Sequence, residues 1–190
     1  MLYGVVISML IGISMGCFPI VEALFGWSLS LLAKIPPTSM LAVFLTMGAI
    51  MGWDQHTLFV MLITFGITPT LTHNIYLAVN NHIKAEQIDK AYTLGASNGE
   101  VISGVIIPRI FPIIIDSIRL TIGPAMVYLI AVEYFLGSEG FGYRLRMQAR
   151  LQAFNVVYDY ILILGFTGLF MDYMLVLVRK WWSPWFDLER

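Results

Sequence analysis

Two long stretches without a charged side chain constrain the fold of this sequence most strongly. Residues 1–21 and 55–83 contain no Lys, Arg, Asp or Glu. A helix of about 20 residues crosses the roughly 30 Å apolar core of a bilayer. The rest of the chain agrees, because 58% of its 190 residues are hydrophobic and 12% are charged, whereas about 25% of a soluble domain is charged. We therefore predict an all-α integral membrane protein.

Charges and prolines divide the chain into about five predicted spans of one transmembrane domain, residues 1–190. We expect a short link at residues 26–34, followed by an extended entry into the second span at Pro36 and Pro37. Pro108 is expected to break the chain before the fourth span. The predicted spans lie at residues 1–24, 36–53, 55–83, 110–135 and 155–178.

The distribution of basic residues predicts which end faces the cytoplasm, because cytoplasmic loops are enriched in Lys and Arg. We place the polar loop at residues 84–104 inside. That side then holds seven basic residues, namely Lys34, Lys84, Lys90, Arg109, Arg179, Lys180 and Arg190. The opposite side holds three, namely Arg144, Arg146 and Arg150. The Trp-rich residues 181–185 are expected to contact membrane lipid at the interface.

Polar and small residues inside the spans predict two kinds of contact between helices. Ser8, Gly12 and Gly16 recur every four residues, a spacing that favours close packing against another helix. Asp116 and Arg119 are three residues apart and can pair on one helical face. This pair either stabilises the bundle or takes part in transport, because charges inside a bilayer are costly and are often functional.

Composition and motifs argue against several classes of function. The net charge of -1 lacks the positive field that nucleic-acid binding requires. A single cysteine, Cys17, and three scattered histidines indicate no metal site. The chain has no H-E-x-x-H pattern and no Walker A loop. We therefore expect no nucleic-acid partner, no metal and no enzymatic activity in this chain.

The polar loop carries the most specific local signals. Residues 85–94 can form a helix that Gly95 ends in the left-handed conformation. Residues 97–100, Ser-Asn-Gly-Glu, fit a capping box that starts a second helix. The loop is therefore predicted to form a helix–turn–helix at the membrane surface, either as a partner-binding element or as a simple connector.

The loop also resembles a known motif. Asp89-Lys90-Ala91 is followed after three residues by Gly95 and after nine more by residues 105–108, Val-Ile-Ile-Pro. This spacing resembles the EAA loop of binding-protein-dependent ABC importer permeases, with Asp89 in place of Glu and Lys90 in place of Ala. Further segments are similar to the nitrate, sulfonate, taurine and bicarbonate branch of these permeases: residues 35–37, 92–97, 131–133, 140–143 and 183–185, and Asp172.

The resemblance implies a type I importer permease, a multi-pass protein of the bacterial inner membrane with a cytoplasmic coupling helix in the loop at residues 84–108. It implies ATP-binding subunits that hold ATP and Mg, so that no cofactor is expected in this chain. It also implies a second permease copy, expected to form a homodimer, and a periplasmic or lipid-anchored substrate-binding protein. The solute would be a small anion such as nitrate, sulfonate, taurine or bicarbonate. Such permeases usually carry one more amino-terminal helix, and the span predicted at Met1 corresponds to their second.

The resemblance assigns roles to residues of the loop. Gly95 would form the sharp turn, and Asp89 would make a polar contact with the ATPase. Ala91 and Ala96 would allow the ATPase to approach closely. The remaining candidates for ATPase coupling end the motif, and they are Val105 and Pro108.

Five further residues are candidates for the substrate path or its outer mouth. The three outer arginines, Arg144, Arg146 and Arg150, would attract an anion, form salt bridges to the binding protein or contact anionic lipid. The intramembrane candidates are Arg119 and Glu133, although an anion path would not hold an unpaired carboxylate. We therefore expect the carboxylates of Glu133 and Asp172 to be neutralised or bonded to a helix.

Two other classes of protein remain as alternatives at this point. A stand-alone ion-coupled carrier or channel would need no ATPase, so copurification of an ATP-binding subunit would distinguish it. An intramembrane enzyme would use carboxylates such as Asp116, Asp159 or Asp172, but these residues form no recognisable catalytic pattern across two spans.

Overall fold

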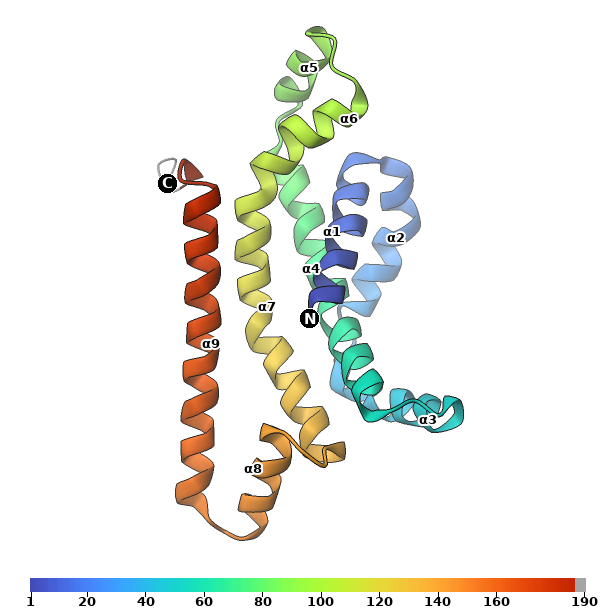
Figure 1. The fold of residues 1–190 in the computed structure, drawn as a ribbon. Coiled ribbons are helices and arrows are strands. Elements are labelled where there is room, and N and C mark those ends of the chain that lie inside the picture. Colours follow the sequence, from blue (N-terminus) through green and yellow to red (C-terminus); the bar gives the residue numbers. More distant parts are fainter. Residues whose placement is uncertain (187–190) are drawn as a thin grey trace.

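The computed structural model describes residues 1–186 as helices joined by short links (Figure 1). No strand occurs among these residues, which confirms the all-α prediction. In chain order the elements are α1 (Leu2–Cys17), α2 (Pro19–Leu32), the 3₁₀ turn η1 (Pro37–Met40), α3 (Leu41–Met51), α4 (Gln55–His82), α5 (Ala85–Thr93), α6 (Asn98–Val101), the π-helical turn η2 (Ile102–Ile106), α7 (Ile107–Leu136), α8 (Phe141–Arg150) and α9 (Phe154–Trp182).

Three helices among the described residues are long and apolar enough to cross a membrane, fewer than the five spans predicted. They are α4, the continuous helix from α6 to α7, and α9. A fourth is formed if α2 and the η1–α3 helix count as one span, although an 85° bend separates them. Helix α1 has 16 residues and is shorter than the roughly 20 that a full crossing takes.

The amino-terminal prediction of one helix over residues 1–24 and a link at 26–34 is wrong. The chain leaves the helical conformation at Phe18 (φ -125°, ψ 111°), and α2 then runs from Pro19 to Leu32. Proline disfavours the helical conformation in the residue before it and is well accommodated at the first position of a helix. Phe18-Pro19 therefore ends one helix and begins the next.

This break also changes the position of Lys34. Gly16 lies against Val79 near the end of α4, whereas Leu29 and Leu32 line a hollow with Met61 in its first half. Helix α2 therefore runs away from the α5–α6 end of the molecule (Figure 1). Lys34, which we counted with the cytoplasmic residues, lies toward the α8 end instead.

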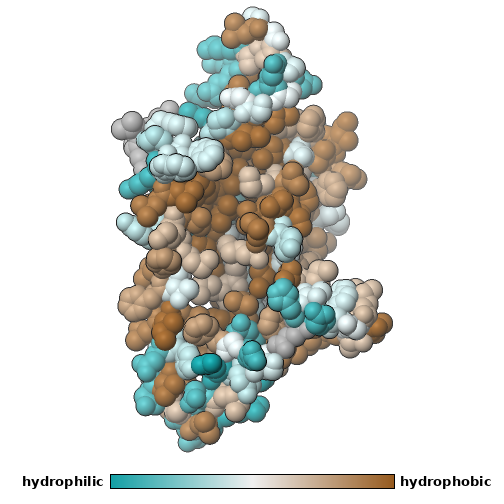
Figure 2. All heavy atoms as spheres, viewed as in Figure 1, coloured by the Kyte–Doolittle hydropathy of each residue, from teal (hydrophilic) through white to brown (hydrophobic). Residues whose placement is uncertain are grey.

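The surface is divided as a membrane protein requires. Hydrophilic residues gather around the α5–α6 end and around the α8 end, and a hydrophobic band lies between them (Figure 2). Apolar side chains on this band, such as Leu120 and Phe166, are 76% and 69% exposed. In a bilayer such a band lies in the hydrocarbon region.

Helix α1 packs unusually close to α4. Ser8 is fully buried and donates a hydrogen bond to the carbonyl oxygen of Thr68 (3.2 Å). A Cβ atom on Gly12 would lie 2.9 Å from the Ile75 side chain and from the Thr72 carbonyl oxygen. The predicted close packing of the small residues is therefore confirmed, because the surfaces leave no room for a side chain.

Helix α4 also forms the core with α7, on the side that leads into the polar loop. Seven buried side chains make up this core, namely Leu71, Ile75, Val79, Val101, Ile106, Ile110 and Ile114. Val101 and Ile106 belong to α6 and η2. The core thus continues without a break from the membrane helices into the polar loop.

Helix α9 is attached differently, because none of the residues in its most apolar window is buried. Arg119 of α7 binds Asp172 through Nε (2.8 Å) and Nη2 (2.9 Å) and Asp116 through Nη1 (3.0 Å). Asp116 also binds Nη1 of Arg179 (2.7 Å). The chain Asp172–Arg119–Asp116–Arg179 joins α7 to α9, and it confirms both the predicted pairing of Asp116 with Arg119 and the neutralisation of Asp172.

Close packing of α1 on α4 predicts that Gly12→Ala destabilises the protein by about 1–3 kcal/mol, the usual cost of overpacking. The matched control is Gly165→Ala, since a Cβ atom there meets nothing within 4 Å. That control should be neutral or slightly stabilising, because alanine favours helix. Thermal unfolding of the two purified variants measures the difference, and equal melting temperatures would contradict close packing at Gly12.

The ion-pair chain predicts that Asp116→Asn loosens α9 by about 1.5–3 kcal/mol, the range for hydrogen bonds to charged groups. The Arg179 side chain is only 9% exposed and would lose the negative charge of Asp116. Asp159→Asn, at an exposed position of α9, is the control. Thermal unfolding should also show that Arg179→Gln destabilises the Asp116→Asn variant less than it destabilises the wild type. Equal destabilisation of both would refute the coupling between the two residues.

Candidate functional site

The coupling segment, residues 84–108, turns at Gly95 through hydrogen bonds that glycine makes possible. The Gly95 N–H donates to the Tyr92 carbonyl oxygen (2.9 Å), and the Ala96 N–H donates to that of Ala91 (3.1 Å). These two bonds define a Schellman motif. Gly95 has a φ of +87°, as predicted, and a residue with a side chain would be strained there.

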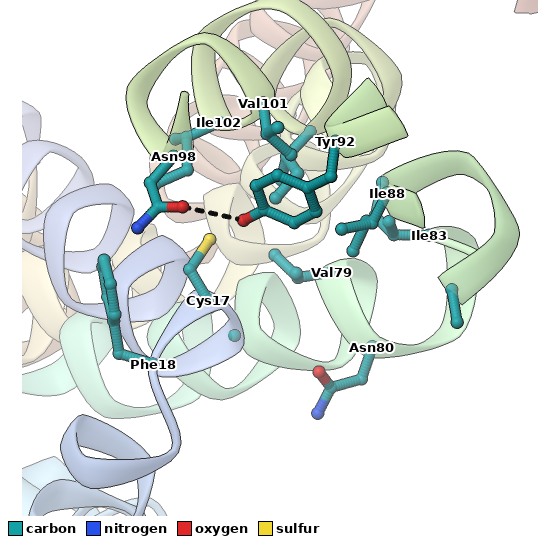
Figure 3. A pocket seen from close by; sticks show the side chains of 13 residues that line it. Cys17, Phe18, Val79, Asn80, Ile83, Ile88, Tyr92, Asn98, Val101 and Ile102 are labelled. Carbon is teal, nitrogen blue, oxygen red and sulfur yellow. Dashed lines mark hydrogen bonds between the residues drawn. The ribbon is translucent and has the colours of Figure 1, made fainter. Parts of the chain in front are cut away.

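The second half of the turn starts α6 with the predicted capping box. The Ser97 N–H donates to Glu100 Oε2 (2.7 Å), and the Ser97 hydroxyl accepts from the Glu100 N–H (3.5 Å). The Tyr92 hydroxyl donates to Asn98 Oδ1 (3.0 Å) across the turn (Figure 3). Helices α5 and α6 are therefore tied together on both sides of Gly95 and form one rigid unit.

Residues 95–99 also fit the G-x-S-x-G pattern of hydrolase nucleophiles. That pattern places its serine on a turn between a strand and a helix. Ser97 instead follows helix α5, and its hydroxyl is bonded to Glu100 (2.8 Å). The local chemistry is that of a helix cap, with no activated nucleophile.

The two alanines of the motif face inward. Ala91 and Ala96 pack against the core described above, together with Ile83 and Ile88. Charged and large residues are among those that remain on the outside. Asp89 and Lys90 are exposed, and the Leu94 side chain at the tip is 88% exposed. Both alanines remain partly exposed, and the close approach of the ATPase to them stays a prediction.

A cavity of about 450 Å³ lies between the coupling segment and the membrane helices. Cys17 and Phe18, at the break between α1 and α2, face Ile88 and Tyr92 across it (Figure 3). Asn80 and Asn98 add polar groups to a lining that is otherwise mostly apolar. The coupling segment thus rests on the core along one edge and borders an open space along the other.

Pro108 does not break the chain, contrary to the prediction. The helix continues from residue 98 to residue 136, and Pro108 is exposed in the first turn of α7. Just before it, the Ile107 N–H bonds the Ile102 carbonyl oxygen, five residues back. A π-helical turn of this kind lets the helix continue past a proline, which has no backbone N–H to donate to the preceding turn. Val105 lies within that turn and is half-buried.

The intramembrane candidates are both engaged within the chain. Arg119 is held by Asp116 and Asp172, far along α7 from the α8 end. Glu133 accepts a hydrogen bond from the Gly142 N–H (2.8 Å) in the first turn of α8. A Cβ atom on Gly140 would lie 2.5 Å from the Glu133 carboxyl carbon. Glu133 therefore caps α8, where the helix dipole favours a negative charge.

The three outer arginines all lie on α8, but their surroundings differ. Arg146 donates to the carbonyl oxygens of Phe135 and Gly137 (both 3.1 Å) and so closes the end of α7. Arg144 lines a cavity, and a hydrogen bond with Tyr160 is the main cause that raises its pKa. Arg150 is exposed in the last turn. They do not form a uniform cationic collar.

Arg179 is the functional candidate that the sequence reasoning missed. It was counted only as a cytoplasmic charge, yet it binds both carboxylate oxygens of Asp116 (2.8 and 2.7 Å). A signal was available, because Asp172 and Arg179 are seven residues apart and therefore share a helical face, like Asp116 and Arg119. Each helix thus carries one acidic and one basic residue on one face, and this pattern predicts that α7 and α9 meet through these four residues.

Comparison with known proteins gives a match over nearly the whole chain. Residues 4–186 match the family described as binding-protein-dependent transport system inner membrane component. A probable ABC transporter permease of Brucella melitensis is 26% identical over 96% of this chain and 72% of its own length. The taurine transport system permease protein TauC of Escherichia coli is 24% identical, over 92% and 62% of the two chains. The putative aliphatic sulfonates transport permease protein SsuC of Bacillus subtilis is 26% identical, over 97% and 65%.

Permeases of this family are membrane subunits without enzymatic activity. A separate subunit hydrolyses ATP, and a substrate-binding protein delivers the solute. The long apolar helices of this chain agree with such a multi-pass protein of the inner membrane. The chain belongs to the binding-protein-dependent transport system inner membrane component family and is the permease subunit of an ABC importer.

Proposed function

We propose that this permease imports a small solute with an anionic oxo group and that its coupling segment docks on the partner ATPase. The observation that carries the docking is the rigid α5–α6 unit, which leaves the membrane helices and ends in the exposed Leu94. The solute class comes from relatives named for the import of taurine, nitrate and aliphatic sulfonates. ATP and Mg would be bound by the ATPase.

The docking face is suited to a groove in another protein. Leu94 is 88% exposed, and the charged residues Asp89 and Lys90 are exposed on the preceding turns of α5. An apolar anchor inside a polar rim is the usual anatomy of a protein interface. In this proposal Leu94 enters the groove, and Asp89 makes a polar contact at its edge.

The same unit transmits movement to the membrane helices. Ile88 and Val101 pack into the core shared by α4 and α7. Because packed cores shift as units and do not deform continuously, a displacement of α5–α6 would tilt α4 and α7 together. The solute path would then open alternately to the two sides.

The assembly around this chain follows from the same proposal. A second identical permease would complete the path, and membrane lipid would cover the rest of the apolar band (Figure 2). The binding protein would meet the α8 end, which is opposite the coupling segment (Figure 1). Exposed Arg150 of α8 is available there for an ion pair with it.

Replacing Gly95 tests the coupling role. Gly95→Leu places a side chain at φ +87°, a conformation that costs roughly 1–2 kcal/mol for L-residues. We expect the turn to reorganise and uptake to fall by about tenfold, the factor that corresponds to 1.4 kcal/mol. ATP hydrolysis by the complex should persist but no longer depend on the loaded binding protein.

Gly99→Leu is the matched control, because a Cβ atom there meets nothing within 4 Å and φ is not positive. Both variants are assayed in proteoliposomes that contain the ATPase and the binding protein. Wild-type uptake in the Gly95 variant, or equal loss in both variants, would remove Gly95 from the coupling mechanism.

Solute selectivity is tested on the same complete importer. We expect taurine, nitrate or an alkanesulfonate to raise its ATP hydrolysis several-fold, because the relatives carry such solutes. Glycerol and choline, which lack an anionic oxo group, should not. Stimulation by choline or glycerol alone would overturn the proposed solute class and leave the coupling role of Gly95 standing.

A further inference from the structure

A second cavity, of about 760 Å³, lies at the α8 end of the molecule. It is formed by the link between α7 and α8, the first turn of α8 and the beginning of α9. Its lining consists of Ser138, Glu139, Gly140, Phe141, Tyr143, Arg144, Tyr160 and Ile163. Neither Arg119 nor Glu133 contributes to its lining, and the α8 end is opposite the coupling segment (Figure 1).

The cavity presents one positive and one negative side chain. Arg144 and Glu139 both line it and both are exposed. Their neighbours Arg146 and Glu133 are bonded to the backbone, whereas no ion pair joins Arg144 to Glu139 in the described part of the chain. Tyr160 and, more weakly, Glu139 favour the charged form of Arg144 and raise its pKa, and a guanidinium carries five N–H donors. Both charges therefore keep hydrogen-bonding capacity for a ligand.

The rest of the lining is aromatic. The rings of Phe141 and Tyr160 are in edge contact with their centroids 5.9 Å apart, and Tyr143 lies beside them in the lining. Aromatic faces attract ammonium groups. An ammonium group near Glu139 would thus find a carboxylate and ring faces within one cavity.

We propose that this cavity binds a zwitterion, with its anionic oxo group on Arg144 and its ammonium group on Glu139. A simple anion would be attracted by Arg144 and repelled by Glu139, and a simple cation would meet the reverse, so only a ligand that carries both charges satisfies the lining. The inference rests on the proposed function in that it names the solute this end of the importer would receive.

Two sources supply this chemistry. One is a free aminosulfonate released by the binding protein. The other is the headgroup of an ethanolamine phospholipid, because Ile163 of the cavity belongs to the exposed apolar face of α9. Both present an oxo anion and an ammonium group on a two-carbon link, so the cavity is assigned to the shared chemistry.

Binding to the permease–ATPase complex in nanodiscs, without ATP or binding protein, tests the assignment independently of coupling and import. In discs of phosphatidylglycerol alone, titration measures the binding affinity for taurine and for isethionate, in which a hydroxyl replaces the ammonium group. In mixed discs, mass spectrometry counts the phosphatidylethanolamine retained relative to phosphatidylglycerol. Loss of import in the earlier assays would leave these binding results unchanged.

We expect at least one arm to show a preference of tenfold or more for the ammonium-bearing ligand. Glu139→Gln should abolish that preference, and Arg144→Gln should abolish binding, whereas Arg144→Lys retains part of it. Asp159→Asn, which changes a carboxylate of α9 outside the cavity lining, is the control and should bind as wild type.

A taurine preference identifies the solute and a phosphatidylethanolamine preference identifies the lipid. Equal binding with and without the ammonium group in both arms, or an unchanged preference in Glu139→Gln, overturns the proposal.

Discussion

The packing of α4 between α1 and α7 is the contact on which the rest of the structure depends. Leu71 and Ile75 of α4 are completely buried, with α1 on one side and α7 on the other. The glycines of α1 allow its backbone to approach α4 until no Cβ atom would fit. In a bilayer, where lipid is as apolar as leucine, association of helices relies on such close van der Waals contact. The coupling segment extends the same core, so its position is fixed by α4.

Helix α9 depends on a different interaction. It buries no residue of its most hydrophobic window; it meets α7 through the chain Asp172–Arg119–Asp116–Arg179 and through the rings of Phe111 and Trp182. Two positive and two negative side chains cancel, which lowers the cost of keeping them within a membrane protein. The two attachments therefore differ in kind, since α1 is held to α4 by close packing and α9 is joined to α7 by charged hydrogen bonds.

Local chemistry made part of this structure predictable from the sequence. The turn at Gly95 and the cap at Ser97 and Glu100 were predicted because each depends on residues within one turn of helix. The break at Phe18 and the continuity through Pro108 were not, because a proline either ends a helix or is absorbed by a π-helical turn, and the neighbouring packing decides which. The partnership of Arg179 with Asp116 spans 63 residues and required the arrangement of α7 and α9. The sequence shows which groups need partners, and the tertiary structure selects the partners.

The three arginines of α8 illustrate how structure separates residues that look equivalent in sequence. Arg146 closes the carbonyl groups at the end of α7, so its charge is used to connect α7 and α8. Glu133 does the complementary task by capping the start of α8. These two contacts join the end of α7 to α8, which carries Arg144, and Glu139 of the link between the two helices lines the same cavity as Arg144. One pair of opposite charges, Glu133 and Arg146, is thus bonded to backbone groups, whereas Arg144 and Glu139 line the cavity.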